Sequence, residues 1–179
     1  LILKECEPMR QLFAFQEYFD KGQAAAKAGE GAMAVDFLEK AVAAAHENRG
    51  RANAAYALGK AHRDLLQDGD RALQAFHTVM QTPIDGAGSA VRLHARMDAA
   101  GLLRKAGRHD EALRLLDEGE GMRRHDYWWA RALAARGQIA EDRDQKEQAL
   151  ACYREALALP AVDKAQAEWL RKRLEALQP

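Results

Sequence analysis

The feature that most constrains this chain is a register of small residues inside helix-sized segments. It is clearest over residues 130–160, where a polar turn at 142–145 separates two helix-length stretches. Gly137 lies in the middle of the first stretch. The second stretch carries small and large residues in alternation: Ala149, Tyr153 and Ala156. Because glycine destabilises a helix interior by about 1 kcal/mol relative to alanine, its presence there indicates that another backbone comes close. We therefore predict a helical hairpin.

The same register occurs four times along the chain. Small residues inside the first segments are Gly22, Gly59, Ala100–Gly101 and Gly137, and alanines follow 12 or 13 residues later at Ala34, Ala72, Ala112 and Ala149. Large residues come next at Leu38, Phe76, Leu116 and Tyr153, and smaller ones after them at Ala41, Val79, Gly119 and Ala156. The alanines lie 38, 40 and 37 residues apart, and the second turn, QDGD, carries one inserted residue. This pattern predicts four consecutive hairpins.

The pattern resembles the tetratricopeptide repeat (TPR), which has a 34-residue period, glycine in helix A, alanine early in helix B and proline at its end. The resemblance covers about residues 13–160, with Pro83 and Pro160 after second helices. The copies run long, and they mostly lack the first-helix Trp and Tyr of the consensus. The alternative is a helical-hairpin solenoid of another kind.

The resemblance implies an all-α, right-handed α-solenoid of about four TPR-like hairpins. We expect a loose lead-in over residues 1–8, repeats over about 9–48, 51–82, 89–119 and 126–159, and a C-terminal capping helix within 161–179. The capping helix should bury one apolar face and expose one charged face. We expect nine helices, with Asp70 and Asp110 among the residues that cap them. A TPR-like scaffold implies binding of a protein or peptide in its concave groove.

Composition narrows the function classes. A chain of 179 residues fits one domain, and its 27 basic and 27 acidic residues balance. That balance gives no argument for nucleic acid or an anionic membrane surface. No apolar run reaches the roughly 20 residues of a membrane span. Cys6 and Cys152 lie at opposite ends of the repeats, so we expect no intrachain disulfide. We expect a cytoplasmic location, with export left open.

The first helix is unusually aromatic. Leu12, Phe13, Phe15, Tyr18 and Phe19 cover more than one helical face. One interpretation is an aromatic wedge against the next two helices. The other is that the surplus face meets an upstream segment or a second copy of the chain, which would make this a sensory or oligomerisation segment of a larger protein, self-associating as a homodimer.

The groove residues follow from the resemblance, which places the first helix of each hairpin on the concave face. The candidates for partner binding are Tyr56, Lys60, Arg63, His94, Met97, Arg104 and Arg131. Together they are basic and apolar, which suits an acidic and hydrophobic peptide. The alternative is that they are ordinary solvated helix charges. The Lys/Asn/Arg carboxylate clamp of some TPR chaperone adaptors is absent at the corresponding positions, which hold Phe19, Gln23, Ala57, His94 and Asp98.

An enzyme is the rival class, and the sequence does not favour it. None of the six histidines belongs to an HExxH motif, and the two cysteines form no C-x-x-C pair. His109-Asp110-Glu111 and His125-Asp126 fall at expected helix starts, where carboxylates favour the helix dipole. We therefore expect no catalytic residue, metal or cofactor. Trp128-Trp129 could stack nucleic-acid bases, but core packing fits its helical spacing better.

Overall fold

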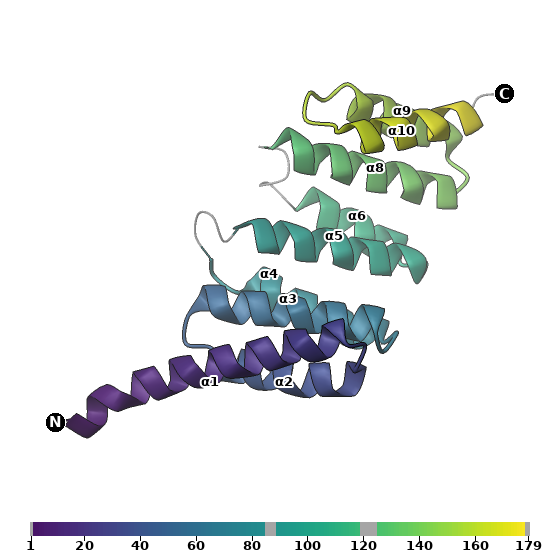
Figure 1. Cartoon of the computed structure of the whole chain (residues 1–179). Coiled ribbons are helices and arrows are strands. Elements are labelled where there is room, and N and C mark those ends of the chain that lie inside the picture. The colour runs from purple at the N-terminus through teal and green to yellow at the C-terminus, as the bar shows by residue number, and fades with distance from the viewer. Residues whose placement is uncertain (1, 85–88, 119–124, 178–179) are drawn as a thin grey trace. The chain divides into compact units, whose positions relative to one another are not determined.

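The computed structural model describes the backbone of residues 2–84, 89–118 and 125–177, and side chains over 12–84, 90–118 and 125–177. Within these ranges the chain contains nine α-helices and no β-strand (Figure 1). In chain order they are α1 (Ile2–Lys27), α2 (Gly31–Ala44), α3 (Asn48–Asp64), α4 (Gly69–Gln81), α5 (Ser89–Lys105), α6 (His109–Asp117), α8 (Asp126–Asp142), α9 (Lys146–Leu157) and α10 (Lys164–Ala176). The fold is all-α.

Sequential helices pair as hairpins. α1 packs on α2, α3 on α4 and α8 on α9, while α2 also contacts α3, and α9 contacts α10. α5 and α6 are joined by the short turn around Gly107, and the Arg96 guanidinium donates to the Leu115 carbonyl oxygen across that pair at 2.8 Å. The helices group into two compact units, Leu1–Ala95 and Arg96–Pro179.

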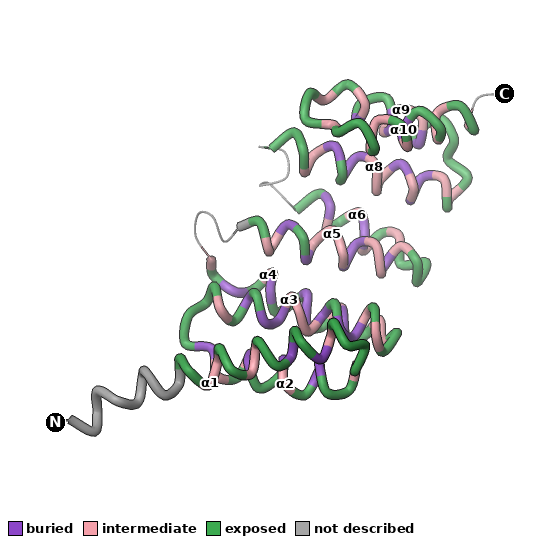
Figure 2. The backbone as a smooth tube through the Cα atoms, in the orientation of Figure 1, coloured by how far each residue is buried: buried purple, intermediate pink, exposed green. Residues whose placement is uncertain are grey.

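The predicted register of small and large residues forms the core of each hairpin (Figure 2). The four helix-B alanines, Ala34, Ala72, Ala112 and Ala149, are all 0% exposed. The four large residues that follow, Leu38, Phe76, Leu116 and Tyr153, are at most 1% exposed. Ala41, Val79 and Ala156 are also fully buried, and Gly119 lies outside the described residues. The register is therefore confirmed as the packing seam wherever the structure describes it.

In three hairpins the mid-helix glycines make room for large side chains of the next helix, and not for another backbone as expected. A Cβ atom at Gly59 would lie 2.5 Å from Phe76 Cε1, so an aromatic side chain, rather than another backbone, fills the space beside this glycine. In the third hairpin Ala100 is 1% exposed, whereas a Cβ at Gly101 would meet nothing within 4 Å. The seam position there is Ala100, and Gly101 is not required for packing.

All four hairpin turns use a residue in the left-handed conformation. These residues are Gly29 (φ +78°), Gln67 (φ +55°), Gly107 (φ +73°) and Asp144 (φ +58°). In the first, third and fourth turns, the next residue's N–H donates to a carbonyl five residues back: Glu30 to Ala25, Arg108 to Leu103 and Gln145 to Ala140. In the second turn Asp68 reaches six residues back to His62, which accounts for the inserted residue. This is the helix C-terminal motif in which glycine is preferred.

Several helix boundaries differ from expectation. α1 begins at Ile2, so residues 2–8 are helical where a loose lead-in was expected, because strong helix formers precede Pro8 in LILKECE. The N-cap of α4 is Asp68, which accepts from the Arg71 N–H at 3.0 Å, and not Asp70. Asp110 lies inside the first turn of α6 and pairs with Arg143 instead of capping.

Helix α10 behaves as the expected end cap of its hairpin. Asp163 caps it by accepting from the Gln166 N–H at 2.8 Å. Leu170 is fully buried, and Val162, Trp169, Leu174 and Leu177 pack on the same cluster of α8 and α9 residues. The opposite face is charged and exposed, with Lys164, Glu168, Arg171, Lys172 and Glu175. None of the helices described here combines the length and apolarity needed to cross a bilayer.

Candidate partner-binding surface

A cavity of about 660 Å³ opens in the first compact unit, between α1 and α3. Residues from one face of α1 and one face of α3 line it, and Leu38 of α2 also contributes to the lining. The lining residues are Phe19, Gln23, Ala26, Lys27, Leu38, Asn53, Tyr56, Ala57, Lys60, Ala61, Asp64 and Leu65. Apart from Leu38 of α2 and Leu65, which follows α3, these residues lie on the first helices of the first two hairpins, which the TPR resemblance assigns to the concave face.

The base of the cavity is part of the hydrophobic core. Leu38 and Ala61 are 1% and 4% exposed and belong to the cluster that joins α1, α2 and α3. Phe19 packs on the same cluster, and its ring stacks on Phe15 with centroids 5.7 Å apart. The Tyr56 ring lies 5.8 Å from that of Phe76 and 5.9 Å from that of His94. These contacts hold the apolar walls in place without a ligand.

The charged groups around the cavity are not equivalent. Asp64 is paired with Arg63 through two hydrogen bonds of 2.6 and 3.0 Å. Lys27 and Lys60 have no acidic partner among the described residues, and Lys60 Nζ lies 6.0 Å from the Tyr56 ring centroid. The cavity therefore presents two uncompensated positive charges above an apolar base.

The structure places the candidate residues of the first unit in different situations. Tyr56 and Lys60 line the cavity, whereas His94 is not among the lining residues and its ring centroid lies 5.9 Å from that of Tyr56. Arg63 does not line it; the guanidinium packs over the Phe76 ring at 6.0 Å while it pairs with Asp64. The sequence suggested that Arg63 contributes to a basic and apolar surface, and the structure shows its guanidinium paired with Asp64.

The second unit has a smaller cavity of about 390 Å³, formed by α5, α8 and α10. Of the candidates, Met97 and Arg131 line it, together with Trp169 and Gln166 of α10. The Arg131 guanidinium also lies 5.7 Å from the Tyr127 ring centroid and 6.0 Å from that of Trp128. The role of α10 in this lining was missed at the sequence level, because Trp169 there was assigned only to the buried face of the cap.

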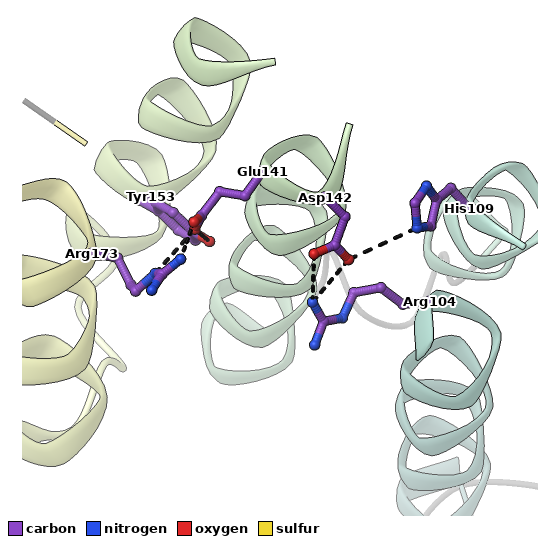
Figure 3. A network of polar contacts seen from close by, with 6 residues as sticks. All are labelled: Arg104, His109, Glu141, Asp142, Tyr153 and Arg173. Atoms are coloured by element: carbon purple, nitrogen blue, oxygen red, sulfur yellow. Dashed lines mark hydrogen bonds and ion pairs between the residues drawn. The ribbon is translucent and has the colours of Figure 1, made fainter. Parts of the chain in front are cut away.

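Arg104 belongs to a polar network and not to either cavity. Its Nη1 donates to both oxygens of Asp142 at 3.2 and 2.9 Å, and His109 Nε2 lies 3.8 Å from the same carboxylate (Figure 3). In the same view Glu141 accepts from the Tyr153 hydroxyl and from the Arg173 guanidinium. Burial and this carboxylate raise the pKa of Tyr153, and the Glu141 hydrogen bond raises the pKa of Arg173. The Glu141 contacts tie α10 to α8 and α9, whereas the Asp142 contacts join α8 to α5 and α6.

The two tryptophans of α8 are both half-buried and make different contacts. Trp129 packs on the α8–α9–α10 cluster, and its indole N–H donates to Glu155 at 3.3 Å. Trp128 contacts Tyr127 edge to face at 5.2 Å. The two rings therefore do not form one continuous surface on which nucleic-acid bases could stack.

These hairpins, with buried alanines and paired large residues, form an all-α fold of TPR-like helical hairpins. No protein-family model matches the chain, and no curated protein matches it in sequence. Among solved structures, it is similar to the one titled "Crystal structure of MamA", a TPR protein, with a TM-score of 0.64 and 19% identity. The match covers 88% of this chain and 81% of that chain. The TPR-like fold expected from the small-residue register is thus confirmed.

Proposed function

We propose that the chain is a non-catalytic interaction scaffold that binds a protein or peptide partner on its first-helix surface. The observation that supports this most is the 660 Å³ cavity between α1 and α3, which combines an apolar base with two uncompensated lysines. Binding sites for small ligands and side chains are typically concave, mostly apolar and of about 300–1,000 Å³.

The mechanism is binding by a preformed surface. Leu38, Ala61 and Phe19 belong to the core of the hairpins, so the cavity walls need little ordering when a partner binds. A receptor that is already ordered avoids the entropic cost of fixing loops and side chains. Tyr56 is suited to act as an anchor, because aromatic residues dominate the energetics of many interfaces.

The test is affinity capture with three versions of the chain, read out by quantitative mass spectrometry. Ala57→Trp fills the cavity, and Ala43→Trp adds the same bulk at an exposed position of α2. The proposal expects at least one partner that wild type and Ala43→Trp retain and Ala57→Trp loses. Circular dichroism establishes that both variants are folded. If every captured protein binds all three versions equally, the cavity is not the binding surface.

A second candidate function is self-association through α1. This helix has 26 residues and runs past the end of α2, which has 14 (Figure 1). Leu12 and Phe13 on it are 59% and 71% exposed, whereas Phe19 packs on the core cluster and Phe15 lies against Gly50 of α3. Light scattering on the wild type and a Leu12→Ser/Phe13→Ser variant tests it. A monomer at all concentrations would exclude self-association, and a dimer that the variant dissociates would support it.

A further inference from the structure

We propose that the partner segment in the α1–α3 cavity is a linear acidic peptide in which one bulky apolar side chain is flanked by carboxylates. This inference rests on the proposed function, because it specifies the chemistry of the partner at the same cavity. Three independent properties of the lining lead to it: an apolar base, two lysines without acidic partners, and two exposed amide side chains.

The apolar base calls for a large apolar side chain. Phe19, Leu38, Tyr56 and Leu65 line the cavity, and Ala57 and Ala61 leave open space between the helices. A volume of about 660 Å³ has room for one such side chain together with its neighbouring main chain. Burial of that side chain removes apolar surface from water and provides most of the binding free energy.

The charges call for carboxylates beside that side chain. Lys27 lies in the last turn of α1 and Lys60 is exposed on α3, so they line the cavity from two helices. The carboxylate among the lining residues, Asp64, is already paired with Arg63. A basic segment would add repulsion at both lysines, whereas an acidic one would form two charge-assisted contacts.

The amides suit an extended peptide main chain. Gln23 of α1 and Asn53 of α3 are exposed and line the same cavity. Each side-chain amide both donates and accepts hydrogen bonds. The backbone groups of an extended segment have no partners within the segment, so they need such groups when they leave water. This arrangement differs from the Lys/Asn/Arg clamp for a terminal carboxylate, which this chain lacks.

The experiment measures fluorescence anisotropy with three labelled peptides of equal length. The first has a central Trp flanked by Glu residues, the second has the same Trp flanked by Lys, and the third has a central Ala flanked by Glu. The inference expects the first to bind wild-type chain at least about tenfold more tightly than the other two. Lys27→Glu/Lys60→Glu should weaken the first peptide about tenfold and strengthen the second.

The matched control is Lys21→Glu/Lys40→Glu. It changes the net charge equally at exposed positions of α1 and α2 whose lysines pair with Glu17 and Asp36 outside the cavity. This control should bind the first peptide like the wild type. All four lysines are exposed, so their substitution should leave the core packing intact, and thermal unfolding checks this.

Each other outcome overturns the inference. If Lys27→Glu/Lys60→Glu and Lys21→Glu/Lys40→Glu weaken binding of the Glu-flanked peptide equally, the effect comes from net charge and not from the cavity. If wild-type chain binds the Lys-flanked peptide as tightly as the Glu-flanked one, the cavity has no preference for acidic peptides. Binding by none of the peptides also contradicts it. The proposed function fails separately: it stands if a peptide of any charge, or a captured partner, is lost in Ala57→Trp, and it falls if nothing depends on that variant.

Discussion

The ring of Tyr153 fills the space beside Gly137: a Cβ atom built on that glycine would lie 2.7 Å from both Cδ1 and Cζ of the ring and closer still to Cε1. Gly59 and Phe76 have the same relationship in the second hairpin, and Gly22 and Leu38 have it in the first. In these three hairpins one glycine of helix A is therefore matched to one large residue of helix B. This pairing sets how closely the two helices of a hairpin approach.

The first prediction concerns two helical glycines of the second unit. Gly137→Ala should destabilise the chain by about 1–3 kcal/mol, because the new methyl group overlaps a fully buried ring. Gly101→Ala, where a Cβ meets nothing within 4 Å, should stabilise it by up to about 1 kcal/mol through helix propensity. Urea unfolding followed by circular dichroism measures both. If both substitutions changed the free energy of unfolding in the same direction, the pairing of Gly137 with Tyr153 would be contradicted.

The second prediction concerns the hairpin turns. Gln67 adopts a left-handed conformation that costs a non-glycine residue about 1–2 kcal/mol. Gln67→Gly should therefore stabilise the first unit by about 0.5–1 kcal/mol, even though it loses the exposed bond from Gln67 Nε2 to the Asp64 carbonyl oxygen. The control, Gln74→Gly at an exposed position of α4, should cost about 1 kcal/mol. A loss of stability in Gln67→Gly would argue against this turn geometry.

The third prediction concerns the docking of α10. Glu141 is 14% exposed in its side chain and accepts hydrogen bonds from both Tyr153 and Arg173. Glu141→Gln removes the charge from this network and should destabilise the second unit by about 1–3 kcal/mol. Glu168→Gln breaks only the exposed pair with Lys172 and should cost at most about 0.5 kcal/mol. Hydrogen exchange should show faster exchange in α10 for Glu141→Gln alone.

The fourth prediction concerns pH. His62 is 3% exposed, and its Nδ1 atom has no hydrogen-bond partner among the described residues. Burial lowers its pKa from the ordinary value, with smaller opposing effects from Asp68 and Glu39. The imidazole of His62 therefore takes up a proton less readily in the folded chain than in the unfolded chain. Neutral His62 contributes its full stability above about pH 6.5, and this contribution is lost as the pH falls below that value.

Unfolding experiments between pH 7.5 and 5.5 test the His62 prediction. Wild-type stability should fall on acidification, by at most about 1.4 kcal/mol per pH unit. His62→Gln should reduce this slope whatever its effect at neutral pH, and His77→Gln, at an exposed position of α4, should keep it. An unchanged slope in His62→Gln would assign the pH dependence to other groups.

Much of the fold could be predicted from the sequence, because packing of small against large residues leaves a periodic signal. Ala34, Ala72, Ala112 and Ala149 were identified by spacing alone and are all fully buried. The helix ends were harder, since caps depend on local backbone geometry. Asp68 and Asp70 are two residues apart and equally suited as N-caps in the sequence, and only the backbone at the start of α4 selects Asp68.

The candidate surface was predicted less completely. The TPR resemblance placed Tyr56 and Lys60 on the concave face, and both line the α1–α3 cavity. It could not show that Arg63 is paired with Asp64 or that Arg104 is paired with Asp142, 38 residues away. Ion pairs depend on side-chain positions that a repeat register does not encode. Partner binding by any of these residues remains a prediction.

Site-specific photo-crosslinking tests the central claim most directly. A benzoylphenylalanine placed at Gln23, on the rim of the α1–α3 cavity, is compared with the same group at Lys40 on α2, outside the cavity. The account predicts that a captured partner or the Glu-flanked Trp peptide crosslinks from position 23 and not from position 40. Crosslinking from position 40 alone would place the partner on another surface and contradict the account.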